Sequence, residues 1–180
     1  MNKNSVIEQL KQLSPHIIVI LLFIVISFTY FSPVLKGKML DMPDIRHHKG
    51  MSKEVVDFRQ KTGEEALWTN SMFSGMPAYQ ISTKYKANLI QYIDKGLMMG
   101  IPRPANMLFL YLLGFYILLL SLKVDYRLSA VGALAFAFSS YFFIIIQAGH
   151  MSKAHAIAYL PMVVAAVLYT YRGKMLLGGV

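Results

Sequence analysis

Two aspartates just beyond the first apolar block are the first residues in this chain that could do chemistry. Asp41 and Asp44 enclose Met42 and Pro43. A carboxylate here could act as a general base toward an acceptor hydroxyl, and the pair could hold a divalent cation that bridges phosphate oxygens. The alternative is helix capping, with Asp41 as the N-cap, Pro43 in the first turn and Asp44 at the third position. Spacing alone favours capping.

A basic run follows these aspartates directly, with the sequence Arg46-His47-His48-Lys49. Such a cluster could bind a phosphate anion, with Lys49 as a candidate substrate-binding residue. It could equally bind lipid headgroups or nothing specific, because most charge runs are simply solvated. Two adjacent histidines are by themselves a weak metal signal.

The segment from Trp68 to Gln80 combines aromatic rings, amide side chains and a turn rich in Gly and Pro. Sugar-binding loops use these groups, because rings stack on sugars and amides bond their hydroxyls. The candidate substrate-binding residues are Trp68, Asn70, Tyr79 and Gln80. Composition narrowly favours the alternative, anchoring at the membrane boundary, where Trp and Tyr are enriched.

A fourth group of chemically useful side chains lies in the sequence Gln147-Ala-Gly-His-Met-Ser-Lys-Ala-His155. Gln147 and His150 share a face if the helix continues through them. His155 lies at the start of an apolar block, which is costly unless its ring faces protein or water. Lys153 could neutralise a phosphate. Binding and structural roles both stay open at this point.

Four apolar blocks must position these groups, at residues 12–35, 104–122, 128–149 and 154–171. A membrane-spanning helix needs about 20 apolar residues. Hydrophobic residues make up 56% of the chain, against about 45–50% in globular proteins, and a chain of this size cannot bury four such blocks in a soluble core. The sequence therefore predicts an all-α polytopic membrane protein with four transmembrane helices. The first helix is expected to be retained, because no small-x-small cleavage site follows it.

A long polar loop, residues 36–103, separates the first two blocks. Helical spacing at 52–61 and 87–99 predicts two helices within it, the second an amphipathic helix on the membrane surface. Outside this loop, one set of alternate segments carries six Lys and Arg residues and the other carries one. The positive-inside rule then places the N-terminal tail, residues 1–11, in the cytoplasm. The long loop and the turn at 150–153 are predicted to share the extracytoplasmic side.

Small residues fill the third block, which is expected to pack centrally, whereas the bulkier second block is expected to face lipid. Pro161 is expected to kink the fourth helix. Residues 175–180 resemble a fifth apolar run that is cut off, which predicts an N-terminal fragment of a larger membrane protein.

The formal charge of +9 does not indicate nucleic-acid binding, because many of the basic residues flank apolar blocks as orientation signals do. The chain contains no cysteine. Disulfides and thiolate zinc sites are therefore excluded.

Three longer strings together resemble the bacterial membrane-protein family YfhO. They are Trp68-Thr-Asn-Ser-Met-Phe-Ser-Gly-Met-Pro-Ala-Tyr-Gln80, Gly132-Ala-Leu-Ala-Phe-Ala-Phe-Ser-Ser-Tyr141 and Ala148-Gly-His-Met-Ser-Lys-Ala-His-Ala156. Members of this family are longer, with many more spans, and are similar to the C-type membrane glycosyltransferases. Those enzymes take a sugar from a polyprenyl-phosphate carrier at the outer face, and their catalytic carboxylate typically follows the first span.

The resemblance implies that Asp44 is the catalytic base. The pair Asp44-Ile45 and the string Gly50-Met-Ser-Lys-Glu54 match the family pattern. Asp41 departs from it, since an amide is common there, and a two-carboxylate metal site is less favoured as a result. The resemblance also makes His150, Lys153 and His155 candidates for binding the carrier phosphate.

The resulting hypothesis is a glycosyltransferase of the bacterial inner membrane. It would use a polyprenyl-phosphate sugar donor and a cell-envelope acceptor, and no cofactor except a possible divalent cation. The alternative is a transporter or flippase of lipid-linked substrates, although such proteins bind near the bilayer midplane and here the polar groups gather at one face. A non-catalytic membrane partner of a glycosylation system also stays open.

Overall fold

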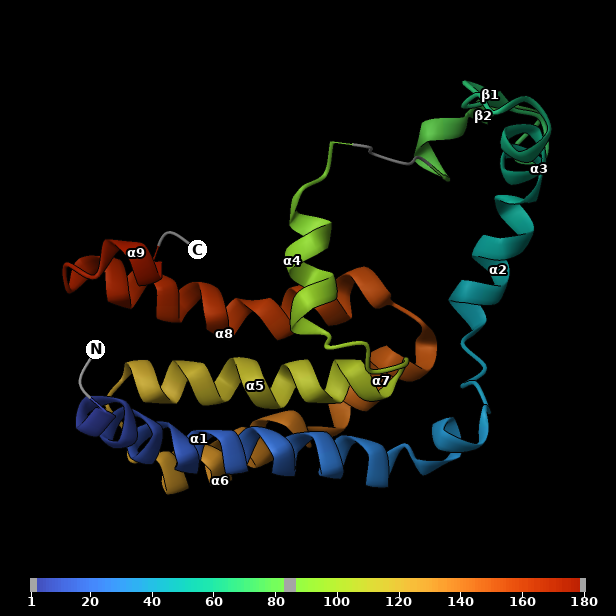
Figure 1. The fold of residues 1–180 in the computed structure, drawn as a ribbon. Coiled ribbons are helices and arrows are strands. Elements are labelled where there is room, and N and C mark those ends of the chain that lie inside the picture. The colour runs from blue at the N-terminus through green and yellow to red at the C-terminus, as the bar shows by residue number, and fades with distance from the viewer. Residues whose placement is uncertain (1–2, 83–86, 179–180) are drawn as a thin grey trace.

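The computed structural model describes residues 3–82 and 87–178, and within them the protein is mostly helical (Figure 1). The apolar helices gather in one bundle: α1 (Lys3–Tyr30), α5 (Ala105–Ser121), α6 (Tyr126–Ala137), α7 (Ser140–Ala148) and α8 (Met151–Tyr171). By length and apolar composition, Lys11–Tyr30 of α1 and the whole of α8 could each cross a membrane, and α6 with α7 could form a third span. The described residues therefore contain two or three helices that could span a bilayer, and α5 is a shorter apolar helix of 17 residues.

The second apolar block, α5, forms the centre of the bundle. Residues 107–112 of α5 have no exposed surface, and α1, α6 and α8 all contact this helix. A Cβ atom added at Gly114 of α5 would lie 2.5 Å from the carbonyl oxygen of Ala158 on α8. The prediction that the third block packs centrally and the second faces lipid is therefore wrong. The small residues of α6 instead give the bulky side chains of α5 room to pack.

The third block, predicted as one helix over 128–149, is broken. Helices α6 and α7 meet at an angle of 51°, and Ser139 between them has an extended backbone (φ −59°, ψ 128°). Serine and aromatic residues of modest helix propensity surround the break. The bend directs the end of α7 toward the chain that precedes α2, where Gln147 Nε2 donates to the Asp41 carbonyl oxygen at 3.4 Å.

The ends of the other predicted spans also shift. Helix α1 starts within the predicted tail and ends at Tyr30, and a 3₁₀ helix, Ser32–Lys36, follows it. Helix α8 continues through Pro161 without a break and begins at Met151. The final run contains a short helix, α9 (Met175–Gly178). Residues 1 and 2 of the tail and 179 and 180 of the final run lie outside the described residues.

The polar loop contains the helices that its spacing predicts. It comprises α2 (Pro43–Met51), α3 (Lys53–Thr62), the antiparallel strands β1 (Trp68–Thr69) and β2 (Met76–Pro77), the 3₁₀ helix η2 (Ala78–Gln80) and α4 (Ile90–Leu97). Helix α3 ends at Gly63, whose φ of 74° suits glycine. In Figure 1, α2 and α3 lead away from the bundle to the two strands. Helix α4 stands at a steep angle to α5 and α8, with one end at the bundle and the other projecting from it.

Candidate functional site

An open pocket of about 660 Å³ lies at the end of the bundle where α2, the chain before α5 and the corner between α7 and α8 meet. These three parts of the chain are far apart in the sequence. The titratable side chains that line the pocket are Asp44, His48, Arg103, His150 and Lys153. One carboxylate therefore faces a set of basic or titratable groups.

The start of α2 places Asp44 in the first helical turn. Met42 is the N-cap and Pro43 is the first helical residue, and no side chain caps the helix. Asp41 instead forms an ion pair with Arg46, with 3.0 Å between Oδ2 and Nη1. The prediction that Asp41 is the N-cap is therefore wrong, because its carboxylate is used outside the helix. Asp44 occupies the first turn as predicted, where the helix dipole favours a negative charge.

Asp44 and His150 form a close pair across the pocket. Asp44 Oδ2 lies 2.6 Å from His150 Nδ1, and each side chain is about half exposed, at 47% and 49%. When the Nδ1–H group donates to the carboxylate, Nε2 of the neutral ring is left as an acceptor. A carboxylate that orients an imidazole is a common arrangement for general-base catalysis.

Gly149 brings these two side chains together. Its φ is +90°, and a Cβ atom added there would lie 3.0 Å from Met42 Cβ and 3.3 Å from Asp44 Cβ. Only glycine combines this backbone conformation with so close an approach. The corner between α7 and α8 thus presses directly on the start of α2, and His150 is the next residue after the contact.

The remaining pocket side chains supply positive charge. Lys153 lies in the first turn of α8, and its Nζ is 5.2 Å from the centre of the Tyr141 ring. Sequence reasoning treated His48 only as part of a basic run and Arg103 only as a boundary residue. A signal for His48 did exist, because it lies four residues after Asp44 on α2 and therefore shares its face. Arg103 carried no such signal, since only the fold brings the chain before α5 to the pocket.

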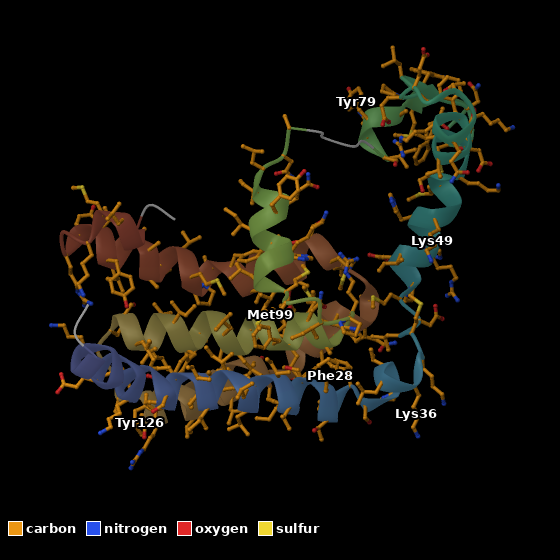
Figure 2. The ribbon with its side chains drawn as sticks, in the orientation of Figure 1. Phe28, Lys36, Lys49, Tyr79, Met99 and Tyr126 are labelled. Atoms are coloured by element: carbon orange, nitrogen blue, oxygen red, sulfur yellow. The ribbon has the colours of Figure 1, made fainter. Side chains whose placement is uncertain are left out.

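The predicted sugar-binding residues lie elsewhere. Trp68 is on β1, with Nε1 donating to Asn70 Oδ1 at 3.2 Å, and Tyr79 and Gln80 lie in η2. Figure 2 shows Tyr79 beside the two strands, well away from the bundle, and Lys49 along α2. Neither these residues nor Lys49 lines the pocket. The structure therefore does not bring the Trp68–Gln80 segment to Asp44.

Glu54 explains how this segment is held. Its Oε2 accepts the hydroxyl proton of Thr69 at 2.5 Å and the backbone N–H groups of Asn70 and Ser71 at 3.0 Å and 2.9 Å. The Thr69 hydroxyl, followed by the two backbone donors, lowers the pKa of Glu54 below its ordinary value. The carboxylate thus ties the segment to α3. Sequence reasoning noticed Glu54 only as part of a family string.

His155 also lies outside the pocket. Its Nδ1 bonds the Met151 carbonyl oxygen at 2.8 Å, and its Nε2 is 3.7 Å from Asp94 Oδ1 on α4. The hydroxyl of Tyr159 donates to the same Asp94 oxygen. These three side chains hold α4 against α8, so the structure gives His155 a contact with α4 rather than with Asp44.

The two carboxylates that could bind a cation have different partners. Asp41 pairs with Arg46 and Asp44 pairs with His150. Within residues 3–82 and 87–178, no three His, Cys, Asp or Glu side chains are grouped as a metal site requires. The arrangement of these side chains adds no evidence for a divalent-cation site at Asp41 and Asp44, and that site stays a prediction.

Comparisons with protein-family models, curated proteins and solved structures find no match to this chain. The resemblance to the YfhO family therefore stays a prediction. The functional argument rests on the pocket and on the groups that line it.

Proposed function

We propose that the protein is a C-type membrane glycosyltransferase, related to the YfhO family, that transfers a sugar from a polyprenyl-phosphate carrier to a hydroxyl of a cell-envelope acceptor. The observation that carries this proposal is the pairing of Asp44 with His150 in a pocket that also holds His48, Arg103 and Lys153. Sugar transfer from a phosphate carrier needs a base for the acceptor and positive charge for the leaving group. This pocket offers both within one space.

The proposed reaction forms one bond and breaks one. The acceptor hydroxyl loses its proton to the Asp44–His150 pair while its oxygen attacks the anomeric carbon. The bond between that carbon and the carrier phosphate breaks, and the phosphate oxygen keeps the electron pair. Arg103 and Lys153 stabilise the negative charge that develops on the phosphate.

The Asp44–His150 pair could take the proton in two ways. Asp44 could accept it directly while His150 holds the carboxylate in place. Alternatively, Nε2 of His150 could accept it, and Asp44 would then stabilise the imidazolium through Nδ1. Both routes need the 2.6 Å contact between Asp44 and His150.

The proposal includes a four-span topology in the bacterial inner membrane, with α5 and the bent α6–α7 pair as the second and third spans. Residues 36–103 would lie on the outer face and the N-terminus in the cytoplasm. The distribution of Lys and Arg supports this orientation. Because the chain has no cysteine, single cysteines at Lys61 and Val124 can report it. A membrane-impermeant maleimide should label K61C and not V124C in intact cells, and the reverse result would contradict the topology.

The experiment that tests the function is a transfer assay with the purified protein in lipid vesicles. A radiolabelled polyprenyl-phosphate hexose is the donor, and incorporation into isolated cell-envelope acceptor fractions is measured. Asp44→Asn should lower transfer by about 10²–10⁴-fold, the usual contribution of a general base, while the matched variant Asp41→Asn should transfer normally. Unchanged transfer by Asp44→Asn would contradict the assignment. Movement of the donor across the bilayer without transfer would indicate a flippase instead.

A further inference from the structure

At the end of the bundle opposite the pocket, the described side chains include five basic ones. Lys11 lies on α1, Lys123 and Arg127 lie where α5 turns into α6, and Arg172 and Lys174 follow α8. Two contacts bring these regions together. His16 Nδ1 on α1 lies 2.7 Å from the Tyr116 hydroxyl on α5. Arg172, which follows α8, donates to the carbonyl oxygen of Ser121 at the end of α5. In Figure 1 this end lies at the left, beside the N label.

The two ends of the molecule differ in how their charges are paired. In the described part of the chain, the contacts of basic side chains with carboxylates all lie in the half with the pocket: Arg46–Asp41, Lys53–Asp57, Arg59–Glu65, His150–Asp44 and His155–Asp94. That half also contains lysines outside these contacts, among them Lys38, Lys49 and Lys61. Among residues 3–82 and 87–178, none of the five basic side chains of the other end lies within 4.0 Å of a carboxylate oxygen. The Asp125 carboxylate caps α6 by accepting from the Arg127 N–H, and it also attracts the Arg127 guanidinium.

Tyrosines accompany these basic residues. The Arg127 guanidinium lies 5.5 Å from the centre of the Tyr126 ring, and Lys174 Nζ lies 5.7 Å from that of Tyr169. Tyr171 is 89% exposed. Tyrosine beside Lys and Arg at the end of an apolar bundle is typical of the level of lipid headgroups.

We propose that this basic end, formed by Lys11, Lys123, Arg127, Arg172 and Lys174, binds the anionic phospholipid headgroups of the leaflet around it. Asp125 offsets only part of this positive charge, so the surroundings must supply the rest. A phosphodiester headgroup with no cation of its own provides both the charge and acceptor oxygens for Arg and Lys. A zwitterionic headgroup already contains an ammonium group that competes for its phosphate. This inference does not depend on the proposed function.

The test compares two lipids on the same protein. The purified protein is placed in mixed micelles that contain equal mole fractions of phosphatidylglycerol and phosphatidylcholine, and the bound lipids are counted by native mass spectrometry. Phosphatidylglycerol should be retained at least about fivefold over phosphatidylcholine, since a single basic residue near an anionic surface contributes a factor of that order. The triple variant Arg127→Gln, Arg172→Gln, Lys174→Gln, which keeps Lys11 and Lys123, should lose most of this preference.

A matched variant removes the same charge from the other half of the molecule: Lys38→Gln, Lys49→Gln, Lys61→Gln. It should keep the preference of the unmodified protein. The charge-conserving variant Arg127→Lys, Arg172→Lys, Lys174→Arg should keep it as well, and it retains a usable protein if loss of charge impairs folding. Added salt should weaken the preference, because exposed charges are screened. Equal binding of both lipids by the unmodified protein, or a preference in the triple Gln variant as strong as in the unmodified protein, would overturn the proposal.

Discussion

Gly149→Ala is the change that most directly perturbs the pocket without replacing any of its charged residues. The added methyl carbon would lie 3.0 Å from Met42 Cβ and 3.3 Å from Asp44 Cβ and the Ile45 nitrogen. These atoms belong to the start of α2 and cannot rotate away, so α2 must move by a few tenths of an ångström. We expect this movement to lengthen the 2.6 Å contact between Asp44 and His150.

Two effects add up in this variant. A residue with a side chain in the left-handed conformation costs about 1–2 kcal/mol, and crowding at a packed contact costs about a further 1–3 kcal/mol. Gly63→Ala is the matched control, because Gly63 has a φ of +74° and no other atom within 4 Å of the added Cβ. It should show the first cost alone. The difference in unfolding free energy between the two variants, measured in detergent, therefore isolates the contact with α2.

A cross-link reports whether α2 has moved. Cysteines at Asp41 and Gln147, whose groups now meet at 3.4 Å, should be joined by a short bis-maleimide, and no native cysteine competes. Gly149→Ala should lower the yield of the linked peptide, whereas Gly63→Ala should not. Equal stability losses and equal yields in the two variants would refute the reasoning.

Three further predictions concern other contacts. The lowered pKa of Glu54 means that its charged form stabilises the Thr69–Ser71 turn, so this stabilisation is present above the ordinary pKa of 4.5 and is lost as the pH falls through the lowered pKa. The fluorescence of Trp68, the only tryptophan in the sequence, should change over that pH range. Glu54→Gln should abolish this change. Tyr159→Phe removes the hydroxyl that bonds Asp94, and amide exchange in Ile90–Leu97 should rise about fivefold, corresponding to about 1 kcal/mol. In Gly114→Ala the added Cβ would lie 2.5 Å from the Ala158 carbonyl oxygen, which should lower the unfolding free energy in detergent by about 1–3 kcal/mol. In the control Gly96→Ala the added Cβ meets no atom within 4 Å, so the unfolding free energy should stay unchanged or rise by up to about 1 kcal/mol.

Periodicity was sufficient to predict two helices of the polar loop. The spacing of apolar residues gave the positions of α3 and α4. The apolar blocks gave the helices of the bundle, because a long apolar run has few other stable conformations in lipid. The break at Ser139 was not predictable in this way, since both halves of the block are apolar and neither contains proline.

Packing between helices was harder to predict than the helices themselves. Small residues in the third block indicated a close contact, and such a contact exists at Gly132, where an added Cβ would lie 2.5 Å from Leu119 Cδ1. Composition does not say which partner is central, however, and the bulky helix α5 is the buried one.

The candidate site was predicted in part. Asp44, His150 and Lys153 were named from the sequence, and the structure brings them to one pocket. Arg103 was missed because its place depends on the path of the chain into α5. His155 was assigned to the same group by proximity in the sequence, but one further turn of α8 carries it to Asp94 instead.

The most direct test of the proposed chemistry is a double-mutant cycle on sugar transfer. Initial rates are measured for the unmodified protein, Asp44→Asn, His150→Gln and the double variant, with a polyprenyl-phosphate hexose as donor. Because Asp44 and His150 touch at 2.6 Å and are proposed to act as one base, the double variant should be no slower than the slower single variant. Independent losses that multiply in the double variant, or full activity in either single variant, would contradict the account.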